Sequence, residues 1–180
     1  MNKILKGYQV CLRSVTKADL EQLRQWRNDP WVKQFMLTQQ NISAEQQLAW
    51  FHKIKADMTQ HHFVIEYKQQ PIGSANIRSR GINVPLTEAR IIEPGLYIGE
   101  PKYRQNILAF APTLLLNDYC FQELNAEKLV AVVKPDNQAA LHYNEKLGYK
   151  VDRQDELIHI SLTESSYQAS TTAIKALLSR

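Results

Sequence analysis

The sequence predicts one α/β domain over residues 1–180, with a mixed, mainly antiparallel sheet flanked by helices. Three observations support this fold class. Short runs rich in β-branched residues alternate along the chain with segments that have helical periodicity. Two of the β-branched runs are separated by a short polar turn, which is typical of a hairpin. No internal repeat, low-complexity tract or linker interrupts this order.

Composition and charge exclude several classes of protein. Hydrophobic residues make up 44% of the chain and charged residues 22%, as in ordinary globular proteins. The net charge of +4 is spread along the whole chain, so we expect no nucleic-acid partner. The charge is compatible with anionic small molecules. The sequence has no apolar run that would span a bilayer and no signal-peptide core, so we expect no membrane partner.

The two cysteines and five histidines show no spacing typical of metal ligands or of redox motifs. Cys11 and Cys120 lie far apart in apolar contexts, which favours buried thiols in a cytoplasmic protein. We therefore predict that no metal is bound. The histidines are interpreted as surface or structural residues, with His142 worth testing because it is adjacent to a candidate acid.

The first elements are a strand and a helix. A strand is predicted over residues 9–13, and Thr16 with Asp19 predicts a cap that opens a helix. That helix is expected to end at Asp29, because the residue before Pro30 is disfavoured in the helical region.

A second helical stretch is predicted over residues 31–36, and Ser43 with Gln46 predicts a capping box that opens the next helix. Residues 63–67 and 72–78 then predict a hairpin. The elements expected in the last third of the chain are a strand over 128–133, a helix over 138–147 closed by Gly148, strands over 149–151 and 157–162, and helical turns over 170–179.

The central stretch, residues 93–121, predicts a strand over 96–98, a polar turn over 99–106 and an apolar helix. This order points unpaired backbone N–H groups at whatever lies above the turn, which favours an anion. A surface turn before a core helix is the alternative interpretation. The helix begins either at Ile107, with Pro112 in its interior, or near Pro112, which then lies in its first turn.

Two motifs resemble the GCN5-related N-acetyltransferase (GNAT) family. Residues 103–109 resemble its pyrophosphate loop: Arg104 and Ala109 match, whereas Ile107 replaces the first glycine. The segment 137–149 resembles its last conserved helix. The matching residues in that segment are Asn137, Ala140, Lys146, Gly148 and Tyr149.

The resemblance implies a GNAT fold in which strand 96–98 diverges from strand 128–133 and leaves a V-shaped cleft. It also implies acetyl-coenzyme A as the cosubstrate. The residues that would contact acetyl-coenzyme A are Leu96, Tyr97, Ile98, Arg104, Gln105, Asn106, Ile107, Leu108, Ala109, Asn137, Asn144 and Lys146.

The same resemblance implies direct attack by an amine, with no protein nucleophile. Glu93 matches an acidic position that serves many family members as a general base, and a solvated strand-end carboxylate is the alternative. The family usually places a proton-donating tyrosine where this chain has Asn144. The adjacent Tyr143 is the remaining acid candidate, although one helical step rotates a side chain by about 100°.

Residues 26–36 resemble a subgroup that acetylates amino sugars carried on nucleotides, including enzymes of pseudaminic acid synthesis. A nucleotide-linked amino sugar is therefore the expected small-molecule acceptor, and a homodimer is possible. Two other functions stay open: a degenerate binding module, and an acetyltransferase of ribosomal-protein N-termini. Core packing for the aromatic residues and a surface salt bridge for the arginine are alternatives to acceptor contacts. The candidate acceptor-binding residues are Arg27, Asn28, Trp31, Phe35 and Met36.

Overall fold

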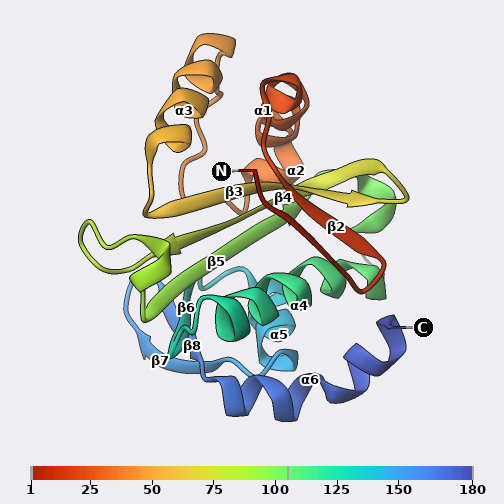
Figure 1. The fold of residues 1–180 in the computed structure, drawn as a ribbon, viewed down its shortest axis with the longest axis vertical. Coiled ribbons are helices and arrows are strands. Elements are labelled where there is room, and N and C mark those ends of the chain that lie inside the picture. The colour runs from red at the N-terminus through yellow and green to blue at the C-terminus, as the bar shows by residue number, and fades with distance from the viewer. Residues whose placement is uncertain (1, 105, 180) are drawn as a thin grey trace.

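A computed structural model describes residues 2–104 and 106–179. In this part of the chain eight strands form one sheet in the order β1-β2-β3-β4-β5-β6-β8-β7 (Figure 1). The pair β5–β6 is parallel and the other neighbouring pairs are antiparallel, which confirms the predicted mixed sheet. The strands are β1 (Ile4–Gly7), β2 (Val10–Ser14), β3 (Gln60–Tyr67), β4 (Gln70–Ser79), β5 (Ile91–Ile98), β6 (Lys128–Val133), β7 (Lys150–Gln154) and β8 (Ile158–Leu162).

Both N-terminal hairpins turn through two residues with positive φ, the backbone geometry that matches strand twist. Tyr8 (φ 50°) and Gln9 (φ 69°) join β1 to β2, so the chain begins with a strand that the sequence analysis missed. Lys68 (φ 49°) and Gln69 (φ 63°) join β3 to β4, between the predicted strands 63–67 and 72–78. Neither turn contains glycine, and the β1–β2 hairpin was missed whereas the β3–β4 hairpin was predicted.

Capping residues set most of the helix starts, as predicted. In the Ser43 box, the Gln46 amide donates to the Ser43 hydroxyl and the Gln46 side chain accepts from the Ser43 amide. Asp29 ends one helix and accepts the first amides of the next. The last helix begins earlier than predicted, after Thr163. The helices are α1 (Leu20–Asn28), α2 (Pro30–Lys33), α3 (Ala44–Ala56), α4 (Ala111–Asp118), α5 (Gln138–Lys146) and α6 (Glu164–Leu178).

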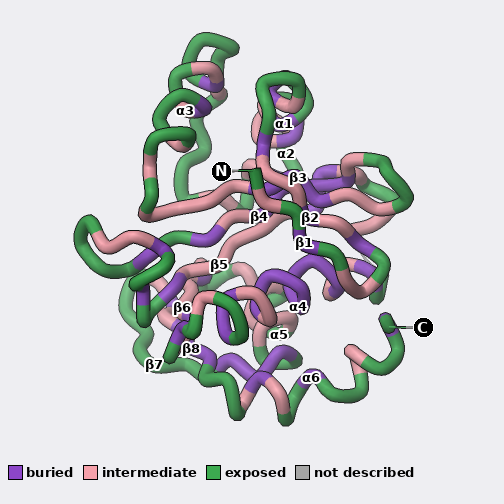
Figure 2. Tube along the Cα trace, viewed as in Figure 1, coloured by how far each residue is buried: buried purple, intermediate pink, exposed green. Residues whose placement is uncertain are grey.

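Helices cover both faces of the sheet. In Figure 1, α1 and α3 lie on one side of the central strands, and α4 and α6 lie on the other. Figure 2 shows α4 as mostly buried and α3 as largely exposed. The larger core lies between α4 and the sheet, whereas a smaller one forms under α1 and α3. The smaller core consists of Val15, Leu20, Leu23, Trp26, Phe51 and Val64.

The central stretch differs from the prediction in its boundaries. Strand β5 begins at Ile91, and short 3₁₀ turns at Pro101–Tyr103 and Ile107–Phe110 precede α4. Helix α4 begins at Ala111, so Pro112 lies in its first turn, where a missing N–H costs no helical hydrogen bond. Of the two alternatives, the start near Pro112 is therefore the one observed.

Strands β5 and β6 separate soon after they meet. Within the described residues, their ladder consists of Ile91 opposite Lys128 and Ile92 opposite Leu129. Beyond Ile92, β5 continues along β4 while β6 pairs with β8. The predicted V-shaped opening is confirmed.

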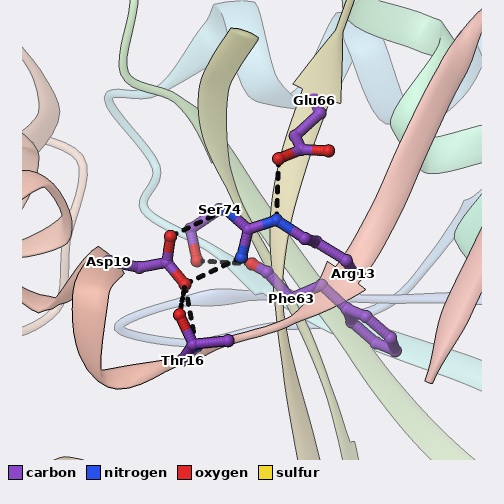
Figure 3. A network of polar contacts seen from close by, with 6 residues as sticks. All are labelled: Arg13, Thr16, Asp19, Phe63, Glu66 and Ser74. Atoms are coloured by element: carbon purple, nitrogen blue, oxygen red, sulfur yellow. Dashed lines mark hydrogen bonds and ion pairs between the residues drawn. The ribbon is translucent and has the colours of Figure 1, made fainter. Parts of the chain in front are cut away.

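A charged cluster attaches α1 to the sheet (Figure 3). Arg13 on β2 donates two hydrogen bonds to the Asp19 carboxylate, at 2.8 and 2.7 Å, and a third to Glu66 on β3 at 2.7 Å. The Asp19 carboxylate also accepts the backbone N–H and hydroxyl of Thr16, which confirms the predicted cap. Burial alone would raise the pKa of Asp19, but the bonds from Arg13 and Thr16 outweigh it and lower that pKa.

In the described part of the chain, no helix combines the length and apolar character that crossing a membrane requires.

Replacing Asp19 by Asn is expected to lower the free energy of unfolding by about 1–3 kcal/mol at neutral pH, because a charge-assisted pair is lost. Since the folded pKa of Asp19 is depressed, its contribution is present above the unfolded value of about 3.9 and is lost as the pH falls through the folded value. The difference from wild type should therefore shrink below about pH 4. Urea denaturation at pH 7 and pH 3 measures this. Glu123→Gln, in an exposed pair with Lys3, is the control and should have little effect at either pH.

Candidate active site

One large cavity of about 940 Å³ opens where β5 leaves β6. Helices α1, α2 and α3 and the loop between α2 and α3 form one wall, strands β3, β4 and β5 form the floor, and α5 contributes the far side. The cavity therefore connects the face of the sheet that α1 and α3 cover with the V-shaped opening.

The end of β5 supplies Gly95 and the three residues that follow it to the cavity. A Cβ atom on Gly95 would lie 3.0 Å from the Asn76 amide oxygen, so a larger residue would displace Asn76. Because β5 has left β6 at this point, the edge of β5 that faces the opening offers main-chain donors and acceptors to a ligand with amide groups.

About half of the residues predicted to contact acetyl-coenzyme A lie in this cavity. Those that line it are Leu96, Tyr97, Ile98, Arg104, Ala109 and Asn137. Asn106, Ile107, Leu108, Asn144 and Lys146 lie outside the lining, and Gln105 lies outside the described residues.

The Arg104 side chain is held by the protein itself. Its guanidinium donates to the carbonyl oxygens of Ile98, at 3.3 Å, and Gly99, at 2.5 Å. It also lies over the Trp31 ring, 4.1 Å from the centroid, with only 10% of the side chain exposed. The Arg104 guanidinium thus braces the end of β5.

The turn after Arg104 satisfies its own amides. Asn106 caps it: the Asn106 side chain accepts from the Leu108 N–H at 2.6 Å, and its carbonyl accepts from the Ala109 N–H at 2.9 Å. Ile107 has a helical backbone and an exposed side chain, whereas Leu108 is buried in the core. The loop therefore differs from a glycine-rich cradle, in which such amides point at a phosphate.

Tyr143 on α5 lines the cavity and ties α5 to the start of α4. Its ring stacks on Phe110, with centroids 4.5 Å apart. Its hydroxyl lies 2.5 Å from the Thr113 hydroxyl and donates to the Ala109 carbonyl at 3.1 Å. Burial raises the pKa of Tyr143, so the phenol keeps its proton at neutral pH.

Asn144 and Lys146, the other candidates on α5, lie outside the lining of this cavity. Asn144 bonds back to the Ala140 carbonyl at 2.8 Å and lines a separate small cavity with Tyr149 and Lys150. Lys146 is exposed at the end of the helix. The Asn137 side chain accepts the Ala140 N–H at 3.1 Å and so caps α5.

Glu93, the predicted base, pairs with Arg80 at 2.9 Å and lies outside the cavity lining. Its cross-strand neighbour Arg78 does line the cavity. Glu93 is therefore engaged by Arg80 near the cavity, and its role as the general base stays a prediction.

The candidate acceptor residues on α1, on α2 and just after α2 mostly reach the cavity. Arg27, Trp31, Phe35 and Met36 line it. Asn28 does not, because its amide bonds to the backbone of Ile42 at 2.9 and 2.8 Å and holds the loop between α2 and α3.

The aromatic pair is part of the cavity wall and not of a core, contrary to the core-packing alternative. Trp31 and Phe35 are 39% and 38% exposed and pack edge to face, with centroids 5.3 Å apart. Both rings therefore keep surface that a ligand can cover.

The charge of the cavity is one-sided. Arg27, Arg78 and Arg104 line it, and no aspartate or glutamate is among the described lining residues. Nη1 of Arg27 is buried and makes no hydrogen bond to any described residue, so the alternative of a surface salt bridge is not observed. Sequence reasoning also missed His62 as a lining residue, because the histidines showed no pattern that would place one here.

The sequence model of the acetyltransferase (GNAT) domain matches residues 9–150. The chain therefore belongs to the GNAT family, and it is an N-acetyltransferase of the kind that moves an acetyl group from acetyl-coenzyme A to an amine.

Three similar proteins extend this comparison. Acetyltransferase PseH of Campylobacter jejuni is 28% identical over 159 residues, which cover 86% of this chain and 92% of PseH. Spermidine N(1)-acetyltransferase of Escherichia coli is 25% identical over 162 residues, covering 90% of this chain and 83% of that enzyme. FdhC, described as a nucleotide-linked sugar GNAT, has a similar fold, with a TM-score of 0.78 at 20% identity over 96% of this chain and 97% of FdhC.

Replacing Arg104 by Ala is expected to lower the melting temperature by about 2–8 °C, because the bonds that brace Ile98 and Gly99 are lost. The dissociation constant of coenzyme A should change by less than about twofold, since the guanidinium faces the protein. Calorimetry measures both quantities. The control is Lys102→Ala, an exposed cation on the same turn. A large loss of coenzyme A affinity in the Arg104 variant would show that its side chain reaches the phosphates.

Proposed function

We propose that this acetyltransferase acts on a primary amine carried by an anionic acceptor, and specifically on a nucleotide-linked amino sugar. The observation that carries the proposal is the cavity itself, which has three arginines and no carboxylate among its described lining residues. Such a lining attracts phosphate groups and repels cations.

Arg27 gives this charge a specific target. A buried guanidinium nitrogen without a hydrogen-bond partner is costly unless a ligand supplies the missing acceptor. Guanidinium groups bind phosphate oxygens in a planar fork geometry. A diphosphate in the cavity would therefore satisfy Arg27.

The aromatic pair suits the base of a nucleotide. Trp31 and Phe35 present half-exposed rings at the cavity wall, and stacking of a base on such a ring is worth about 1–3 kcal/mol. Arg104 over the Trp31 ring holds that ring in place. The phosphate and base contacts come from neighbouring segments, α1 and the region just after it, as a nucleotide requires.

The lining argues against the other acceptors. A polyamine is a polycation and needs carboxylates, which the described lining does not provide, although one relative is a spermidine acetyltransferase. A basic N-terminal peptide would meet the same repulsion. A binding module without turnover is the remaining alternative, and the kinetic tests below detect it directly.

Acetyl-coenzyme A supplies the activated acyl group when it is bound. The residues that would hold it are those at the end of β5, where Leu96, Tyr97 and Ile98 border the opening, together with Ala109 and Asn137. The Tyr143 phenol, which stays protonated at neutral pH, is the proton donor that we propose for the departing thiolate.

Replacing Arg27 by Gln should raise KM for a uridine diphosphate-linked amino sugar by about 10- to 100-fold, because a charge-assisted bond worth about 1.5–3 kcal/mol is lost. Release of coenzyme A measures the rate. Arg24→Gln is the matched control, since Arg24 lies on the same helix but pairs with Glu21 outside the cavity. Wild-type activity with spermidine in preference to the nucleotide sugar would contradict the proposal. Absence of turnover with any primary amine would favour the binding module.

Replacing Tyr143 by Phe should lower kcat by about 10²-fold without changing the affinity for acetyl-coenzyme A, because the proposed proton donor is removed. Thr113→Val, which removes the neighbouring hydroxyl but keeps the phenol, should have a much smaller effect. Asn144→Tyr should not raise kcat, because position 144 faces the separate small cavity. An unchanged kcat in the Tyr143 variant would show that no proton comes from this helix.

A further inference from the structure

A hydrogen-bonded chain of three side chains ends in the cavity. It runs from Asp57, at the end of α3, through Gln60 to His62 on β3. His62 lines the cavity and packs edge to face against Trp50 of α3, with ring centroids 5.0 Å apart. None of these three side chains has a part in the function proposed above.

The chain fixes the tautomer of the histidine. The Asp57 carboxylate, which only accepts, takes the N–H and hydroxyl of Thr59 on one oxygen and the Gln60 amide NH₂ on the other. The Gln60 carbonyl oxygen is thereby turned toward Nε2 of His62, at 2.8 Å. Nε2 must carry the proton, which leaves the lone pair on Nδ1.

Strand register places His62 in line with the end of the cleft. His62 pairs with Asn76 on β4, and Asn76 pairs with Gly95 on β5. Paired residues point to the same face of a sheet, and all three line the cavity. The row therefore runs from the histidine to the point where β5 has just separated from β6.

Burial, together with the nearby cations, keeps His62 neutral. Burial lowers its pKa to about 4, with further lowering from His61 on the same strand and Arg78 on β4, while Asp57 opposes them. Arg27 of α1 adds a further cation to the cavity, and α3 contributes the uncharged Gln46, Gln47 and Trp50. In a cavity rich in cationic donors, His62 thus offers an unprotonated nitrogen.

We propose that Nδ1 of His62 receives the proton of the acceptor amine as it attacks, with Gln60 and Asp57 as positioning residues. This inference rests on the proposed function. The amine nitrogen forms a bond to the acetyl carbon, its proton passes to Nδ1, and the C–S bond breaks with its electron pair leaving on sulfur. An anionic acceptor strengthens the base, because its phosphates offset the cations that disfavour a protonated histidine.

The first test needs no acceptor. Nitrogen-15 NMR of histidine-labelled protein should show His62 as the Nε2–H tautomer at neutral pH, and protonated only near pH 4. A Gln60→Leu variant, which removes the amide, should yield a mixture of tautomers. An Nδ1–H tautomer in the wild type would overturn the inference, whether or not an acceptor is known.

The second test is kinetic. His62→Gln should lower kcat by about 10²-fold, whereas His61→Gln, a neighbouring histidine that bonds Ser14 outside the cavity lining, should not. The double variant Asp57→Asn/Gln60→Glu keeps a hydrogen bond at each step of the chain, with the bond between positions 57 and 60 reversed in direction, and moves the carboxylate next to His62.

The pH profile of the double variant separates a base from a structural residue. In the wild type and in every active variant, kcat/KM should fall as the pH drops below the pKa of the acceptor amine, because only the unprotonated amine attacks. In the wild type, the fall of kcat/KM with decreasing pH should become steeper near pH 4, where His62 is protonated. In the double variant this steeper fall should begin about 1–3 pH units higher, because a carboxylate now contacts the imidazole and raises its pKa. Two outcomes with an active wild type would refute the role of His62 while leaving the proposed function intact. In one, the pH profile of the double variant is the same as that of the wild type. In the other, the His62→Gln variant keeps the wild-type kcat.

Discussion

The site depends on the early separation of β5 from β6. Two residue pairs join these strands, and then each continues along a different partner. A parallel pair that stayed together would have satisfied the main chain of β5 and closed the cleft. Instead, Tyr143 of α5 lines the cavity and contacts Phe110, Thr113 and the Ala109 carbonyl around the start of α4. The opening is thus held by packing and by hydrogen bonds on its far side.

The turn after β5 shows how single residues change a shared architecture. Asn106 supplies from its own side chain and carbonyl the acceptors for two amides of the turn. Arg104 likewise bonds carbonyls of the strand end and covers Trp31. These side chains stabilise the turn without a ligand. In the same cavity, Nη1 of Arg27 is buried and makes no hydrogen bond to any described residue.

The site combines rigid and open parts. The bonds between Arg13 and Asp19 fix α1, the helix that carries Arg27, to the sheet (Figure 3). Helix α2 and the turn that follows it, by contrast, leave Trp31 and Phe35 half exposed. The Asp57–Gln60–His62 chain is a second fixed element, because each bond in it determines the orientation of the next.

The sequence by itself determined the elements and their class. Caps at Thr16, Ser43 and Asn137 act within a few residues, so their helices were predictable, and strand 128–133 was predicted with its observed bounds. The motifs that resemble the GNAT family also predicted the V-shaped cleft and acetyl-coenzyme A as the acetyl donor. Local signals failed at β1, where a turn without glycine hides the hairpin. Tertiary structure alone decided which neighbours in sequence share a site. Tyr143 faces the cavity and Asn144 does not, Glu93 pairs with Arg80, and His62 enters from a strand 33 positions before Gly95. These outcomes depend on helix rotation, on strand register and on which charges meet in space, and none of the three is encoded in a short stretch of sequence.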